Sequence, residues 1–119
     1  MSDNDTTIGE LRSSVQRFVD ERDWQRFHNP KDLSISLCIE AAELLEEFQW
    51  LSPEEVEAAG QDPEARTRVA GELADVLIYA LSLANALDLD VATAVMEKLA
   101  ANARKYPADR FRGRFRLEE

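Results

Sequence analysis

The sequence has little of what disulfide-bonded or nucleic-acid-binding proteins are built from. It contains one cysteine, Cys38, in 119 residues. A single cysteine cannot form an internal disulfide, and its place in an apolar helical stretch predicts a buried thiol. The 14 Lys and Arg residues are outnumbered by 24 Asp and Glu, which gives a net charge of −10. Because non-specific nucleic-acid binding needs a basic surface, we expect no nucleic-acid partner.

Long apolar segments are also scarce. The stretch Met1 to Asp5 is polar and acidic, unlike a signal peptide, and no apolar run approaches the length of a membrane span. We therefore expect a cytoplasmic protein without a membrane partner. The hydrophobic content of 45% supports one domain over residues 1–119, with a core of about 7–107 and flexible or packing tails at 1–6 and 108–119. Apolar faces left over on a short helical chain favour a homodimer or homotetramer.

Helix signals dominate, so we expect an all-α fold: a four-helix bundle with one additional short helix. Thr7 with Glu10, and Ser52 with Glu55, have the spacing of capping boxes, and Asp62 precedes a proline as an N-cap often does. The predicted helices cover about 7–23, 30–50, 53–60, 63–87 and 90–107. The second half of the third long helix, from 76 to 84, is apolar almost all round, which predicts burial on several sides.

The last long helix and the tail complete the expected packing. Val91, Val95 and Leu99 should face inward from the last helix. The tail from Arg110 to Glu119 alternates Arg with Phe, and we expect it to fray or to pack on a neighbouring subunit.

Two pairs of acids are spaced three residues apart on separate predicted helices: Glu40 with Glu43, and Glu72 with Asp75. Residues at this spacing share a helix face, so each helix presents two carboxylates side by side. One such pair is weak evidence, because helix faces are commonly acidic. Two pairs, each beside an apolar face, favour a shared site for Mg²⁺, with Mn²⁺ as a substitute, because hard cations bind carboxylate oxygens. A ferritin-type di-iron site needs Glu-x-x-His, and His28 does not follow any Glu at that spacing.

Basic and aromatic residues supply the other candidate contacts. Lys98, Asn102 and Lys105 share one face of the last helix. Cations suit the dipole at a helix C-terminus, but next to a metal-binding site the same residues can donate to phosphate oxygens. The large aromatic rings either fill the core or stack on a nucleotide base, and the sequence leaves both readings open: Trp24, Phe27, Trp50 and Tyr79.

At these residues the chain resembles the MazG-like nucleotide pyrophosphohydrolases, within the all-α NTP pyrophosphatase superfamily. That family carries E-x-x-E, a spacer and then E-x-x-D, which residues 40–43 and 72–75 match in order and type. The resemblance is closest to the dCTP pyrophosphatase branch and covers most of residues 10–110. It includes the segments Glu21-Arg22-Asp23-Trp24, Phe48-Gln49-Trp50 and Tyr106-Pro107.

The resemblance implies a bundle that assembles as a dimer or a tetramer of dimers, with sites at subunit contacts. It implies hydrolysis of an NTP or dNTP to the monophosphate and pyrophosphate, an activity that sanitises nucleotide pools. Glu40, Glu43, Glu72 and Asp75 would hold Mg²⁺, with Glu40 or Glu43 as the general base. The phosphate contacts would come from Lys98, Asn102, Lys105 and Tyr106, and the base contacts from Trp24, His28, Trp50 and Tyr79.

One position departs from the branch. Where the branch carries a histidine on the first helix, this chain has Val15, which cannot donate a hydrogen bond to a base. The sequence therefore predicts a pyrophosphohydrolase for dCTP or a modified dCTP, with a dUTP or broad-specificity NTP enzyme of the same superfamily as the alternative. A non-catalytic helical oligomer that binds a partner through the Arg/Phe tail is the alternative from another class.

Overall fold

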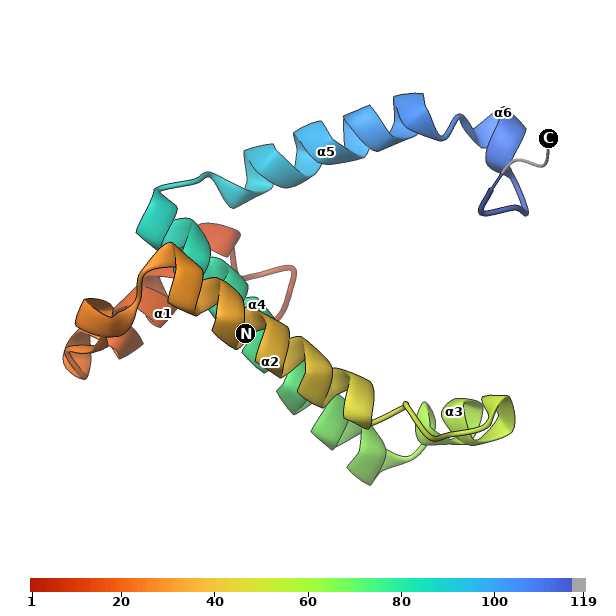
Figure 1. Cartoon of the computed structure of the whole chain (residues 1–119), viewed down its shortest axis with the longest axis horizontal. Coiled ribbons are helices and arrows are strands. Elements are labelled where there is room, and N and C mark those ends of the chain that lie inside the picture. The colour runs from red at the N-terminus through yellow and green to blue at the C-terminus, as the bar shows by residue number, and fades with distance from the viewer. Residues whose placement is uncertain (117–119) are drawn as a thin grey trace. The chain divides into compact units, whose positions relative to one another are not determined.

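The computed structural model describes residues 1–116, and all regular secondary structure in that range is helical (Figure 1). The all-α prediction is therefore confirmed. The chain divides into two units, Met1–Asp88 and Leu89–Glu119, which are described separately. The elements are α1 (Ile8–Glu21), the 3₁₀ helix η1 (Trp24–Phe27), α2 (Pro30–Glu46), α3 (Pro53–Ala59), α4 (Pro63–Leu87), α5 (Val91–Lys105) and α6 (Ala108–Phe111).

Side-chain caps begin the helices where the sequence predicts them. Thr7 starts α1 with a complete capping box: its side chain accepts from the Glu10 amide at 3.1 Å, and its own amide donates to the Glu10 carboxylate at 3.1 Å. Ser52 and Glu55 form the same box at α3. Each cap satisfies amides that have no partner within the helix. The remaining N-caps on long helices are Asn29, Asp62 and Asp90.

The end of α2 differs from the prediction. The sequence pattern continues to Trp50, but α2 ends at Glu46 and residues 47–50 form turns. The Glu47 amide donates to the Leu44 carbonyl at 3.2 Å, three residues back, so the last turn tightens into 3₁₀ geometry and the α-helix stops. Trp50 therefore lies in the connection to α3, with 85% of its surface exposed.

The core of the first unit lies where α1 and α2 pack on α4 (Figure 1). A polar clamp joins α1 to α4: the Arg12 Nε donates to the Asn85 side-chain carbonyl at 2.9 Å, and the Asn85 amide donates back to the Arg12 carbonyl at 3.1 Å. This clamp fixes α1 against the C-terminal half of α4. The buried residues are Val19, Leu33, Ala65, Leu81, Ser82 and Ala84.

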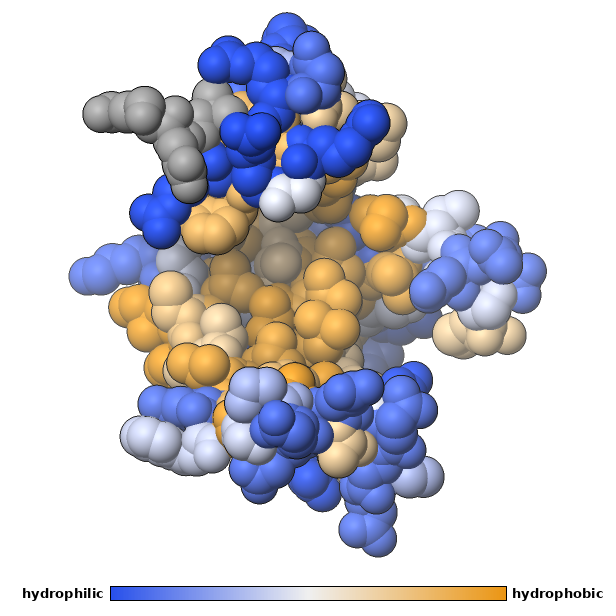
Figure 2. Space-filling view, turned by 90° about the vertical axis from the view of Figure 1, so that its right-hand side faces the viewer, coloured by the Kyte–Doolittle hydropathy of each residue, from blue (hydrophilic) through white to orange (hydrophobic). Residues whose placement is uncertain are grey.

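Several expected burials are wrong within this chain. Cys38 is exposed, and so are Leu77 and Ile78 in the half of α4 that should be covered on several sides. In the second unit α5 has no buried residue, and Val95 and Leu99 are 50% and 56% exposed. Figure 2 shows a face on which apolar side chains are exposed over a wide area. The helix stripes exist as predicted, but neither unit buries its stripe fully by itself.

Part of the tail is helical, and α4 needs a further correction. Residues 108–111 form α6, and Phe111 packs edge-on against Tyr106 at 5.2 Å. Residues 117–119 lie outside the described part. α4 is long and apolar enough, with a mean hydropathy of 1.3, to cross a membrane by length and composition alone. It also carries Glu72 and Asp75, each costing about 2.5–3.5 kcal/mol at a bilayer centre, and it packs on α1 and α2, as core helices do.

Candidate metal and catalytic site

The structure brings acids from α2 and α4 into one cluster. One carboxylate oxygen from each of Glu40, Glu43 and Glu72 lies within 4.8 Å of the others. Asp75, one turn beyond Glu72, is exposed and lies close enough for its charge to raise the pKa of Glu40 and of Glu72. The packing of α2 along α4 therefore combines the two acid pairs that the sequence keeps about 30 residues apart.

The cluster is electrostatically unfavourable without a counter-charge. The pKa of Glu40 is raised, first because burial disfavours the charged carboxylate, and then by a hydrogen bond and charge repulsion from Glu43. The pKa of Glu72 is raised by burial and then by the charges of Glu43 and Asp75. A hydrogen bond between two carboxyls needs a proton on one of them, so these groups compete for protons that a cation would replace.

Two atoms of the cluster have the chemistry of cation ligands. The Oε2 atoms of Glu40 and Glu72 are buried and have no hydrogen-bond partner within residues 1–116. A carboxylate oxygen can only accept, and leaving a buried acceptor without a partner costs about 1–3 kcal/mol. An oxygen-only donor set of this kind is the ligand type that Mg²⁺ and Mn²⁺ prefer. Glu40, Glu43 and Glu72, with Asp75 beside them, could hold such an ion.

The predicted phosphate contacts belong to the second unit. Lys98, Asn102 and Lys105 lie on α5, and Tyr106 is its C-cap. Lys98 and Asn102 are four residues apart and share a helix face. The Lys105 ammonium lies 5.3 Å from the centre of the Tyr106 ring. These four residues thus lie on the second half of α5 and at its C-cap.

The predicted base contacts are spread over the first unit. Trp24 stacks edge-on against Phe18 at 5.7 Å, and Tyr79 is half-buried on α4, one turn after Asp75. His28 precedes α2 and Trp50 follows it, and a helix of 17 residues is about 25 Å long. A single chain therefore does not bring His28 and Trp50 into one base pocket.

The surroundings of His28 and Val15 differ in polarity. His28 lines a pocket of about 180 Å³ whose other polar residues are Gln16, Gln25, Ser82 and Asn85. Val15 lines a separate apolar pocket of about 260 Å³ together with Ser14, Phe18 and Ile78. Val15 thus lies mainly among aliphatic and aromatic groups.

Residues 35–114 match the family described as MazG-like. The chain belongs to the MazG-like family. It is 40% identical over 102 residues to dCTP pyrophosphatase 1 of Homo sapiens, a match that covers 86% of this chain and 60% of the human protein. The bovine dCTP pyrophosphatase 1 is 37% identical, with 92% of this chain and 65% of the relative covered. The chain thus spans about three fifths of the length of these curated relatives.

A solved structure extends the comparison to the fold. The crystal structure of a pyrophosphatase from Archaeoglobus fulgidus superposes with a TM-score of 0.76 at 39% identity. The match covers 90% of this chain and 98% of the archaeal one. The helical architecture of this MazG-like chain is therefore shared over nearly the whole length of the archaeal pyrophosphatase.

One ion pair beside the acids was not predicted from the sequence. Arg68 on α4 forms an ion pair with Glu47, which directly follows α2. A signal was present, because Arg66 and Arg68 are the only Lys or Arg residues between Lys31 and Lys98. A basic residue that is isolated in an acidic region can be identified from the sequence as a candidate anion-binding residue.

Proposed function

We propose that this MazG-like protein is a Mg²⁺-dependent nucleoside triphosphate pyrophosphohydrolase that converts dCTP or a modified dCTP to the monophosphate and pyrophosphate. The observation that carries the proposal is the convergence of Glu40, Glu43 and Glu72, two of which have buried oxygens without a partner. The names of the relatives, dCTP pyrophosphatase 1 and pyrophosphatase, support the same reaction class.

In this proposal the four acids hold Mg²⁺. When bound, the ion offsets triphosphate charge and lowers the pKa of a coordinated water. Glu40 or Glu43 accepts the proton of the attacking water as general base. Lys98, Asn102, Lys105 and Tyr106 contact the phosphate chain. Phosphoryl transfer depends mainly on positioning and on charge stabilisation, and acids, cations and amide groups of this kind provide both.

A homodimer or homotetramer in the cytoplasm completes the proposal. The exposed apolar residues on α4 and α5 would be covered by a second copy, and the distance between His28 and Trp50 supports a base pocket built from two chains. Trp24 and Tyr79 would contribute the remaining contacts to the base. Neither a nucleic acid nor a membrane is part of this proposal.

A second candidate differs only in the base. The apolar surroundings of Val15 favour an enzyme for dUTP or for a broad range of NTPs, because no donor at that position selects cytosine. A cytosine-specific enzyme needs a polar group that is left unpaired by the wrong base. The choice between the two candidates rests on relative turnover across bases.

The test is a pyrophosphate-release assay with Mg²⁺ over the common NTPs and dNTPs. We expect monophosphate and pyrophosphate as products, with dCTP among the best substrates, and loss of turnover by at least about 100-fold in Glu40→Gln. Glu46→Gln is the matched control, because Glu46 is exposed on the same helix and outside the cluster. Equal turnover of wild type and Glu40→Gln would refute the assigned site. Absence of turnover on every nucleotide would refute the proposed substrates.

A further inference from the structure

The acid cluster continues into a third pair of facing residues that carries opposite charges. The charge of Asp75 acts on Glu40, a carboxylate oxygen of Glu43 lies within 4.8 Å of one of Glu72, and Glu47 contacts Arg68. Along α2 and the residue after it, the positions 40, 43 and 47 ascend, while their partners on α4, at 75, 72 and 68, descend. The two helices therefore run antiparallel, and the three pairs follow one another along them. One helical turn rises about 5.4 Å, which places the Glu47–Arg68 pair one turn from the cluster.

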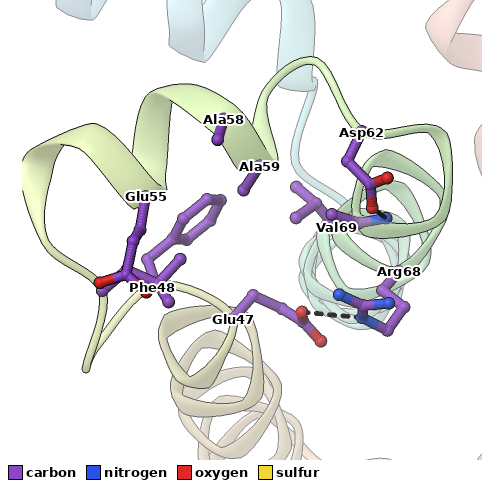
Figure 3. A pocket seen from close by; sticks show the side chains of 10 residues that line it. Glu47, Phe48, Glu55, Ala58, Ala59, Asp62, Arg68 and Val69 are labelled. Carbon is purple, nitrogen blue, oxygen red and sulfur yellow. Dashed lines mark hydrogen bonds and ion pairs between the residues drawn. The ribbon is translucent and has the colours of Figure 1, made fainter.

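The contact within this pair uses a small part of the arginine. The Arg68 Nε donates to the Glu47 Oε2 at 3.2 Å (Figure 3). No hydrogen-bond partner for Arg68 Nη1 or Nη2 occurs within residues 1–116. The Arg68 side chain is 57% exposed and that of Glu47 is 20% exposed. A pair this exposed contributes about 0–1 kcal/mol to stability, so an anionic ligand can replace the carboxylate at little cost.

Arg68 is also the cation that the acidic region otherwise lacks. From residue 32 to residue 97 the sequence contains two basic residues, Arg66 and Arg68. The Arg66 Nη1 donates to the Gly60 carbonyl at 3.0 Å, in the connection before α4, so this residue stabilises a loop. Arg68 is the one that contacts the acid row. A polyphosphate that approaches four carboxylates gains from a fixed cation next to them.

We infer that Arg68 binds the phosphate chain of the substrate and that Glu47 holds the guanidinium beside the metal-binding acids until phosphate replaces it. The planar guanidinium presents parallel N–H groups that match two phosphate oxygens, and its free terminal nitrogens are available for this contact. This inference rests on the proposed function, because it needs a site that takes a polyphosphate. It adds a donor from α4 to those assigned to α5.

The experiment measures binding of inorganic tripolyphosphate with Mg²⁺ to the full chain by calorimetry. We expect Arg68→Ala to weaken binding about ten- to hundred-fold, the usual value of a charge-assisted hydrogen bond. Arg68→Lys should fall between wild type and Arg68→Ala, because it keeps the charge and loses the fork. Arg66→Ala is the matched control and should bind like wild type. Equal affinity of Arg68→Ala and Arg66→Ala would overturn the inference.

Removing Glu47 separates this role from a structural one. If Arg68 must leave Glu47 to bind phosphate, Glu47→Gln should bind tripolyphosphate as tightly as wild type or a few-fold more tightly. A purely structural ion pair would instead give Glu47→Gln and Arg68→Ala effects of the same sign. Weaker binding by Glu47→Gln would overturn the assignment of Glu47 as a placeholder. Melting temperatures of all variants show whether each still folds.

A turnover assay on the same samples distinguishes this inference from the proposed function. Wild-type turnover that is unchanged in Arg68→Ala, together with unchanged tripolyphosphate binding, refutes the role of Arg68 and leaves the function standing. Binding that depends on Arg68 without turnover on any nucleotide supports the role of Arg68 and refutes the function. Failure of wild type to bind tripolyphosphate refutes the role of Arg68, and turnover on the nucleotides then decides the function separately.

Discussion

The helices α4 and α5 both carry an apolar stripe, but only α4 buries part of its stripe within its own unit. On α4, Ala65, Leu81 and Ala84 are buried, whereas α5 has no buried residue and exposes 50% of Val95 and 56% of Leu99. Apolar area is stabilising only when it leaves water, at about 25 cal/mol per Å². The first unit thus forms the acid cluster by itself, whereas the second unit does not bury the stripe on α5.

The strongest test of this comparison is Leu99→Asp. If a second copy covers the stripe, a buried charge at the contact should raise the dimer dissociation constant by about 30-fold or more, the cost of losing an interface anchor. The measurement is molar mass by light scattering across a dilution series. Ala100→Asp, which adds the same charge off the stripe, should leave the assembly intact. A monomeric wild type, or equal masses for both variants, would contradict the comparison.

Asp75→Asn tests whether Asp75 binds the metal together with Glu40, Glu43 and Glu72. Asp75 is the acid of the motif that does not share the 4.8 Å cluster, and it is exposed. If it contributes a ligand only in the metal-bound state, Asp75→Asn should lower turnover by about 10- to 100-fold. Titration with Mg²⁺ should recover part of the activity, because the metal affinity is what changes. If Asp75→Asn is as active as wild type at low Mg²⁺, the other three acids are sufficient to bind the metal.

The two regions also differ in how much the sequence predicted. The helix starts followed from local chemistry, because Thr7, Ser52 and Asp62 cap through amides only three residues away. The acid cluster followed from spacing on two helices. The exposure of Leu77 and Leu99 did not, because an apolar stripe predicts that it will be covered and not by which chain.

The ion pair of Glu47 and Arg68 could not be predicted from the sequence either. Spacing within α4 places Arg68 on the face of Glu72, but whether an acid lies opposite depends on the register between α2 and α4. Register is a tertiary property set by how side chains of both helices interlock. Local propensity also extended α2 to Trp50, whereas the backbone tightened after Glu46 and moved that ring off the helix.

Glu72→Gln tests whether the acid cluster destabilises the metal-free protein. The pKa of Glu72 is raised above its ordinary 4.5 in the folded state, so the folded state retains more protons than the unfolded chain between these values. Stability therefore falls as pH rises through that window, and the loss is complete above it. We expect Glu72→Gln to melt at a higher temperature than wild type at pH 7, and this advantage to vanish below about pH 4.5.

The control and the metal dependence sharpen this test. Glu57→Gln, on α3 and away from the cluster, should leave the melting temperature unchanged. Mg²⁺ should stabilise wild type and stabilise Glu72→Gln less, since a ligand that binds only the folded protein raises its stability by mass action. A lower melting temperature for metal-free Glu72→Gln would mean that the carboxylate is already satisfied within the chain.

The smallest expected effect is that of Val15→His on base preference. Val15 lies on α1 in an apolar pocket with Phe18 and Ile78, so a histidine there introduces a donor where wild type has none. A neutral hydrogen bond contributes about 0.5–1.5 kcal/mol, which corresponds to a gain of about 2- to 12-fold in kcat/KM for dCTP relative to dUTP. The measurement is that ratio, with Val15→Leu as the control for changed volume. An unchanged ratio in Val15→His would mean that the base is read elsewhere, and the polar pocket around His28 would then be the next place to test.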